Sequence, residues 1–107
     1  MILHVNGDIN RYYIQTLSMI FFPGASFPED EQPGPGVPEL TFTLEKTENG
    51  YRAVTDVTLD GVSAHAERER ESSEAYNEER LRKLVTGDSV IAALGDLMEY
   101  RPSWGIL

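Results

Sequence analysis

The chain has 107 residues and a hydrophobic content of 40%, which is enough for one domain with a single core. Eighteen acidic residues against nine basic ones give a formal net charge of -9. This charge repels phosphate backbones and anionic membrane surfaces, so we expect neither nucleic acid nor a membrane as a partner. The absence of cysteine excludes disulfides, iron-sulfur ligation and thiol catalysis within these residues.

The N-terminal stretch MILHV is a short apolar run followed by Asn6, Gly7 and Asp8, a composition typical of a strand that ends in a turn. It lacks the basic start and long apolar stretch of a signal peptide. No apolar run approaches the roughly 20 residues of a membrane span. The sequence therefore predicts a first strand and a cytoplasmic protein.

A first helix is predicted to follow Asp8, a favourable N-cap, and to end before Pro23 and Gly24. Its predicted buried face consists of apolar residues three or four positions apart, namely Ile9, Tyr13, Leu17, Ile20 and Phe21. Residues 23–38 hold five of the six prolines and an acidic run, so they predict a long loop.

The middle of the chain predicts a meander of three strands. Leu40, Phe42 and Leu44 alternate with polar residues in a first strand, and Asn49 with Gly50 predicts a tight turn with positive φ. In residues 51–71 the alternation changes phase at Asp60 and Gly61. A second hairpin explains this change better than one bulged strand of about 20 residues, which exceeds the usual strand length.

A C-terminal helix is predicted to begin at a hydroxyl cap formed by Ser72 or Ser73 and to end before Pro102. Its apolar residues keep helical phase: Leu81, Leu84, Val85, Ile91, Leu94, Leu97 and Met98. At residues 86–89 two alternatives remain, because the helix can run through Gly87 or break so that Asp88 caps a second helix. Five residues are expected to be buried against the sheet: Leu17, Ile20, Leu84, Ile91 and Leu94.

Strands that are apolar on one face need a cover on that face, and two amphipathic helices can supply it. The predicted fold is therefore an α+β two-layer sandwich. Its elements follow the order β-α-β-β-β-α, with a mainly antiparallel sheet and the helices on one face.

Few residues suggest chemistry. His4 and His65 are not spaced as metal ligands, and we expect both to be structural. The alternating charges of residues 67–71 indicate a solvated strand end. The acidic residues 29–31 lack the spacing of a calcium loop. Without a credible triad, a phosphate-binding glycine motif or a zinc-protease motif, we assign no catalytic, cofactor-binding or metal-binding residue and no cofactor to the chain itself.

Four aromatic residues of the first helix allow two interpretations: Tyr12, Tyr13, Phe21 and Phe22. They can form a stacking platform for bases or a porphyrin-like ligand. Aromatic residues at helical spacing are more often part of a core or a domain interface. We therefore favour burial, and leave open whether Tyr13, Phe21 and Phe22 face the core or a neighbouring domain.

Two stretches carry a resemblance to a known family: FFPG at residues 21–24 and PSWGIL at residues 102–107. With the predicted order of elements, they resemble the N-terminal region of coproporphyrinogen dehydrogenase-like radical S-adenosylmethionine proteins, relatives of the oxygen-independent coproporphyrinogen III oxidases of Firmicutes. In that family a P-W-G-x-L stretch runs into T-G-I-R-P, and a CxxxCxxC motif follows. The specific matches are Phe21 to Pro23 and Trp104 to Leu107. Ser103 departs from the pattern, because the family has proline before the tryptophan.

The resemblance implies that residues 1–101 form an accessory domain and that residues 102–107 begin a connection to a downstream radical S-adenosylmethionine domain. Trp104, Ile106 and Leu107 would contact that downstream domain. The 4Fe-4S cluster and S-adenosylmethionine would belong to the parent enzyme, which would decarboxylate two propionates of coproporphyrinogen III to vinyl groups in haem biosynthesis. This domain would itself be non-catalytic.

An alternative of another class is a free-standing acidic protein-interaction module. It would bind a protein through the aromatic helix face or a sheet edge. An enzyme in its own right has the least support from the sequence.

Overall fold

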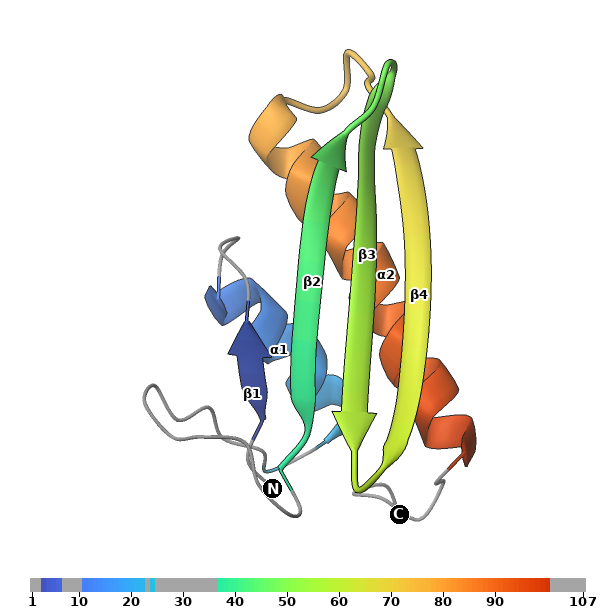
Figure 1. Cartoon of the computed structure of the whole chain (residues 1–107). Helices are drawn as coiled ribbons and strands as arrows, with labels where there is room; N and C mark the ends of the chain where they lie inside the picture. Colours follow the sequence, from blue (N-terminus) through green and yellow to red (C-terminus); the bar gives the residue numbers. More distant parts are fainter. Residues whose placement is uncertain (1–2, 7–10, 23, 25–36, 101–107) are drawn as a thin grey trace.

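The computed structural model of the chain describes residues 3–6, 11–22, 24 and 37–100 (Figure 1). Its elements are β1 (His4–Asn6), α1 (Arg11–Phe21), β2 (Glu39–Lys46), β3 (Gly50–Leu59), β4 (Val62–Glu71) and α2 (Glu78–Tyr100). The order β-α-β-β-β-α is the predicted one, and the α+β class is confirmed.

The four strands form one sheet in the order β1-β2-β3-β4. β1 runs parallel to β2, with His4 opposite Glu39, whereas β2, β3 and β4 pair antiparallel. Both helices lie on the same side of the sheet, α1 behind β1 and β2, and α2 behind the antiparallel strands (Figure 1). The other side of the sheet is left uncovered by the described elements.

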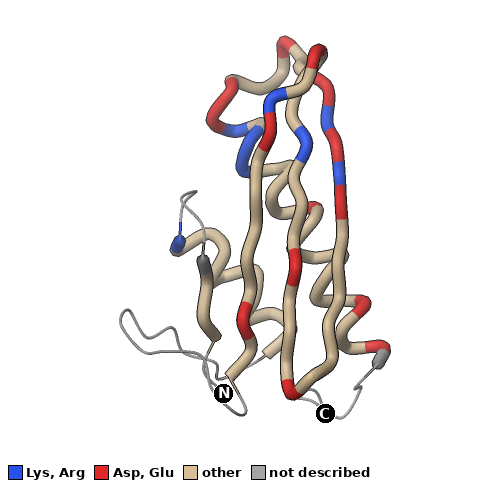
Figure 2. Tube along the Cα trace, viewed as in Figure 1, with Lys and Arg blue, Asp and Glu red and all other residues tan. Residues whose placement is uncertain are grey.

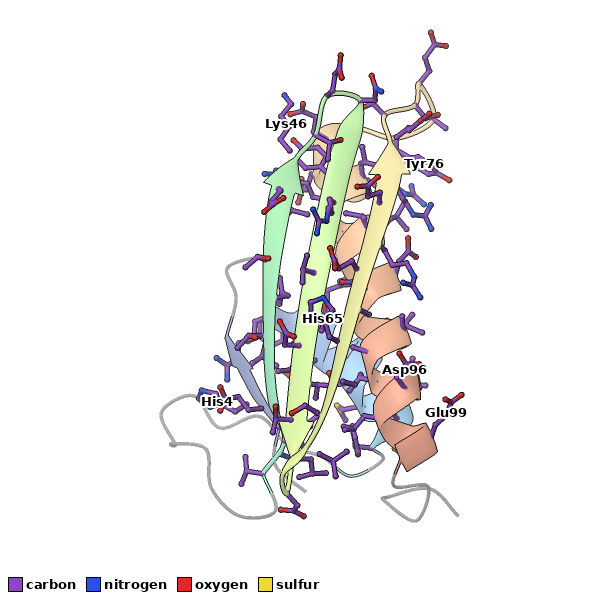
Figure 3. All side chains as sticks on the ribbon, turned by 45° about the vertical axis from the view of Figure 1, so that its right-hand side comes forward. His4, Lys46, His65, Tyr76, Asp96 and Glu99 are labelled. Carbon is purple, nitrogen blue, oxygen red and sulfur yellow. The ribbon has the colours of Figure 1, made fainter. Side chains whose placement is uncertain are left out.

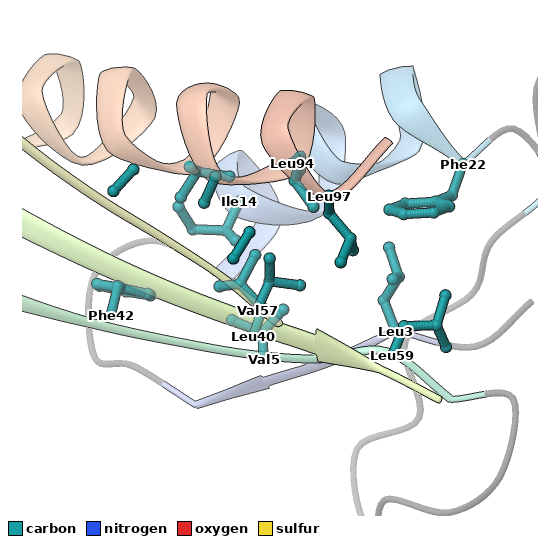
Figure 4. Close-up of a cluster of buried hydrophobic side chains, with 14 of the residues drawn as sticks. Leu3, Val5, Ile14, Phe22, Leu40, Phe42, Val57, Leu59, Leu94 and Leu97 are labelled. Carbon is teal, nitrogen blue, oxygen red and sulfur yellow. The ribbon is translucent and has the colours of Figure 1, made fainter. Parts of the chain in front are cut away.

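The core lies between the sheet and the two helices, and strand alternation fills it from one face of each strand. Figure 4 shows its main part, in which the fully buried side chains include Leu3, Ile14, Phe22, Leu40, Val57, Leu94 and Leu97. A smaller cluster, at the other end of α2, consists of Tyr51, Ala53, Leu81 and Val85.

The predicted buried face of the first helix is only partly right. Tyr13, Leu17 and Phe21 are half-buried and pack against the core, whereas Ile20 is 64% exposed and Ile9 lies outside the described residues. The fully buried row, Ile14 and Ser18, lies one position further along the helix. The helix is apolar at most positions around its circumference, so spacing alone could not select the row that faces the core. Ser18 is polar, so a search for apolar residues at helical spacing does not include it in the buried row.

The second predicted hairpin is confirmed, and the first is shifted by one residue. Asp60 and Gly61 have φ values of 49° and 82°, and a two-residue hairpin turn of type I′, which matches the twist of the strands, requires positive φ at both of its central residues. In the first hairpin the Thr47 amide donates to the Gly50 carbonyl (2.9 Å), and the Gly50 amide donates to Thr47 Oγ1 (3.0 Å). Glu48 and Asn49 therefore occupy the turn, and the positive φ expected at Asn49 and Gly50 is absent.

Gly50 is required for another reason. A Cβ at this position would overlap the Arg70 carbonyl oxygen and approach the Glu71 Cα within 2.8 Å. The first residue of β3 therefore lies against the backbone of β4, where only glycine fits.

α2 is one continuous helix of 23 residues, which settles the alternative at residues 86–89. The prediction of its start is wrong, because Asn77 caps it: the Arg80 amide donates to Asn77 Oδ1 at 2.8 Å. Ser73 instead forms a separate turn before the helix. The Ser72 amide donates to the Asn49 carbonyl (2.7 Å), so the chain is still held at the β2–β3 hairpin where a helix was expected.

Among the residues expected against the sheet, Leu94 is fully buried, whereas Leu17 and Leu84 are half-buried. Ile20 and Ile91 are exposed, by 64% and 45%, so the prediction is wrong for both. In α2 the inner positions near Ile91 are occupied by Thr86, Ser89 and Val90, which are all fully buried. The buried row therefore mixes polar and apolar residues, and a count of apolar spacing alone selected the neighbour of Val90.

Candidate functional site

The uncovered side of the sheet carries the main group of polar side chains. We call it the open face and define it by the alternate residues that point away from the helices: Glu39, Thr41, Thr43 and Glu45 of β2, Arg52, Val54, Asp56 and Thr58 of β3, and Ser63, His65, Glu67, Glu69 and Glu71 of β4. Six carboxylates stand there against one guanidinium. Figure 2 shows that charged residues gather toward the end of the sheet where β2 and β3 are joined.

A side-chain network that includes His65, labelled in Figure 3, crosses the open face. The Nδ1 atom of His65 lies 2.6 Å from Asp56 Oδ1, and its Nε2 atom lies 3.1 Å from Glu67 Oε2. Glu67 is also paired with Arg52, whose guanidinium lies 3.9 Å from a carboxylate oxygen of Glu45.

This arrangement occupies both ring nitrogens of His65. Because carboxylates only accept hydrogen bonds, both contacts are hydrogen bonds only when both ring nitrogens carry hydrogen. While both contacts are kept, neither ring nitrogen is free to bind a metal ion. Within the described ranges no group of three or more His, Cys, Asp or Glu side chains is arranged to hold a metal ion.

A second polar cluster joins α1, α2 and β4. Arg70 binds Asp88 through two hydrogen bonds, Nε to Oδ2 at 2.5 Å and Nη2 to Oδ1 at 3.1 Å. This pairing raises the pKa of Arg70 above its ordinary value. Burial, together with the negative charge of Asp88, raises the pKa of Tyr13 above its ordinary value.

Gly87 lets α1 and α2 approach at this cluster. A Cβ at Gly87 would lie 2.6 Å from the Tyr13 hydroxyl oxygen and 3.3 Å from Leu17 Cδ1. The cluster therefore ties the two helices to the end of β4.

A third polar contact lies inside the core. The Thr55 and Ser89 hydroxyls are 2.6 Å apart, and Ser89 donates to the Thr86 carbonyl at 2.9 Å. Since the Ser89 hydrogen is used there, Thr55 donates to Ser89. Both side chains are fully buried, so this pair fixes α2 on β3 and is closed to a substrate.

Two hollows are lined by polar residues and open to solvent. One, of about 330 Å³, lies at the tip of the β2–β3 hairpin and is lined by Thr47, Glu48, Asn49, Glu69, Arg70 and Glu71. The other, of about 260 Å³, is lined by Asn77, Glu79, Arg80 and Lys83. Small-molecule sites are concave and mostly apolar, so neither hollow favours a substrate pocket.

The residues singled out from the sequence are not brought together. Trp104, Ile106 and Leu107 lie outside the described residues, as do residues 29–31. His4 is on β1 and His65 on β4, at opposite edges of the sheet. The aromatic residues of α1 do not share one surface, because Phe22 is fully buried, Tyr13 and Phe21 are half-buried against the core, and Tyr12 is 79% exposed.

Sequence reasoning missed the pair of Asp56 and His65, although a signal for it was present. The two residues lie four positions before Asp60 and four positions after Gly61, so the predicted turn places them opposite each other. The pair of Arg70 and Asp88 gave no such local signal.

Comparison of the sequence with models of known protein families gives no match, and comparison with curated proteins gives none either. Of the helices described, neither combines the length and hydropathy needed to cross a bilayer.

Proposed function

We propose that the chain is a non-catalytic N-terminal accessory domain of an oxygen-independent coproporphyrinogen III oxidase-like radical S-adenosylmethionine enzyme of haem biosynthesis, in the cytoplasm. The observation that carries the proposal is the FFPG stretch at residues 21–24 together with WGIL at residues 104–107, in a chain whose elements follow the order β-α-β-β-β-α. Phe22 lies fully buried at the end of α1, which is compatible with a structural role for the first stretch.

The residues present do not fit the cofactors of such an enzyme. A 4Fe-4S cluster is held by cysteine thiolates, and the chain has no cysteine. We therefore assign no step of the radical reaction to these residues. The proposal places the cluster and S-adenosylmethionine in a downstream domain, with Trp104, Ile106 and Leu107 at the contact between the two domains.

The first test is the coding sequence after Leu107. The proposal expects T-G-I-R-P directly after this residue and CxxxCxxC further on. A stop codon at that point would contradict it and favour the free-standing acidic interaction module.

The second test uses protein. After anaerobic reconstitution with iron and sulfide, the 107-residue chain is expected to show no iron-sulfur absorption and no S-adenosylmethionine cleavage, whereas the longer chain is expected to show both. Either activity in the 107-residue chain would overturn the accessory role.

Trp104 gives a third test, because it is the only tryptophan. Its emission is expected to shift to the blue in the longer chain, where the downstream domain covers it. A fully blue-shifted emission protected from quenchers in the monomeric 107-residue chain would instead show that Trp104 packs within this domain.

A further inference from the structure

The open face carries more negative charge than it can neutralise. Its single guanidinium, Arg52, is already shared by Glu45 and Glu67. Glu69 and Glu71 follow Glu67 at alternate positions of β4, about 7 Å apart along the strand. No ion pair within residues 37–100 includes either of them.

Like charges in this arrangement repel each other and lower the stability of the folded chain. The hollow at the hairpin tip extends the same negative surface, because Glu48, Glu69 and Glu71 line it together with one cation, Arg70, which is paired with Asp88. Since the described helices leave this side of the sheet free, the excess charge is available to a partner of opposite charge.

We infer that the open face is a docking surface for a basic, extended protein segment whose Lys or Arg side chains recur at alternate positions. Alternate residues of an extended chain on the same side are about 7 Å apart, which matches the spacing of Glu67, Glu69 and Glu71. β3 and β4 have ten residues each, so the face is about 33 Å long and can accommodate about ten residues of such a segment.

The side-chain network favours this mode of binding. Asp56, Glu67 and Glu45 are held by His65 and Arg52, so fewer side-chain rotamers must be fixed when a partner binds. Nucleic acids and anionic lipids are repelled by the same charges. A second copy of the chain is disfavoured as an occupant, because its own open face has the same excess charge. The inference concerns this chain alone and is independent of the proposed parent enzyme.

The experiment measures binding of a ten-residue peptide of alternating Lys and Thr, by fluorescence anisotropy at low ionic strength. The test variant is Glu69→Gln with Glu71→Gln. The matched control is Asp96→Asn with Glu99→Gln, which removes the same formal charge from exposed positions of α2 (Figure 3). Both variants are compared at concentrations where sedimentation shows a monomer.

The test variant is expected to bind the peptide about fivefold to tenfold more weakly, since two exposed charge pairs are lost. The control variant is expected to stay within about twofold of the unmodified chain. The test variant should also melt at the same or a higher temperature, because repulsion on β4 is relieved. Loss of binding without loss of stability separates a docking role from a structural one.

Amide chemical shifts locate the peptide independently of the variants. We expect changes in β3 and β4 and none in the exposed residues of α2. Equal weakening by the two variants, shifts spread over α2, or no binding by the unmodified chain would each overturn the inference. A peptide of five Lys followed by five Thr should bind more weakly, and equal binding would overturn the spacing argument.

Discussion

At the scale of single residues, the pKa of Tyr13 depends on its position at the junction of the two helices. Its phenol is half-buried beside the ion pair of Arg70 and Asp88, and both burial and Asp88 raise its pKa. The neutral phenol is therefore favoured in the folded chain, whereas the unfolded chain titrates near the ordinary value of about 10. The contribution of Tyr13 to stability is thus complete below about pH 10 and is lost as the pH rises through the higher pKa of the folded state.

We therefore predict that Tyr13→Phe removes part of the decrease in the free energy of unfolding above about pH 10. Urea unfolding on both sides of that pH measures the effect. Tyr12→Phe is the matched control, because Tyr12 is 79% exposed on the same helix. If the two variants give the same alkaline profile, Tyr13 is not the group responsible.

Two residues of α2 that are three positions apart should respond very differently to truncation. Leu94 is fully buried, and Leu94→Ala is expected to lower the free energy of unfolding by about 2 to 5 kcal/mol. Ile91 is 45% exposed, and Ile91→Ala should cost less than about 1 kcal/mol. Chemical denaturation of both variants tests the assignment. Similar losses would show that α2 is rotated relative to the sheet.

The elements differ in how far the sequence could predict them. The strands were predictable because one face of the sheet is buried, so side chains must alternate, and a wrong register would expose the whole apolar set. The turn at Asp60 was predictable for the same reason, since the alternation changes phase there. The same turn places Asp56 opposite His65, so this pair of the open-face network could have been predicted, although it was missed.

The helices were less predictable because their start and their buried face depend on contacts with other elements of the fold. The start of α2 depends on the amide of Ser72, which is held by Asn49 from the hairpin, so the choice between Ser73 and Asn77 as a cap is not local. The buried row of α2 includes Thr86 and Ser89, whose hydroxyls are satisfied by a contact across the core. The pair of Arg70 and Asp88 depends on how α2 lies on β4, which no local pattern shows.

Glycine provides a test at the level of the elements. Gly50→Ala is expected to lower the free energy of unfolding by about 1 to 3 kcal/mol, because the new methyl group overlaps the backbone of β4. Gly95→Ala should instead stabilise the chain by about 1 kcal/mol, since a Cβ there meets nothing within 4 Å and alanine favours a helix. Thermal or urea unfolding distinguishes the two signs. Stabilisation by Gly50→Ala would show that β3 and β4 do not approach so closely.

At the level of the whole molecule, β4 is an edge of the sheet and has ten residues. An exposed edge of that length is a template for pairing with another chain. In β4 the glutamates 67, 69 and 71 point to the open face, and Arg70 points to the helices, where it binds Asp88. The two kinds of charge are therefore sorted onto opposite faces of one strand.

This sorting opposes self-association. Consider a second copy of the chain that pairs antiparallel with the first along β4 and is related to it by a two-fold axis. The open faces of the two copies then lie on the same side of the joined sheet. Residues directly opposite each other therefore come from the same face. A register that places Glu69 opposite Glu71 of the copy also places Arg70 opposite Arg70. Registers centred on residue 68, 69 or 70 bring glutamate against glutamate and arginine against arginine, and like charges directly opposite are destabilising.

We therefore predict that Glu69→Thr with Glu71→Thr promotes dimerisation through β4, because the repulsion is removed and threonine favours strands. Sedimentation velocity over a range of concentrations measures the change, and the unmodified chain should remain monomeric over that range. Asp96→Asn with Glu99→Gln lowers the net charge equally but lies on α2, and it should not associate. If this control dimerises to the same extent, net charge rather than the placement of charge on β4 keeps the molecules apart.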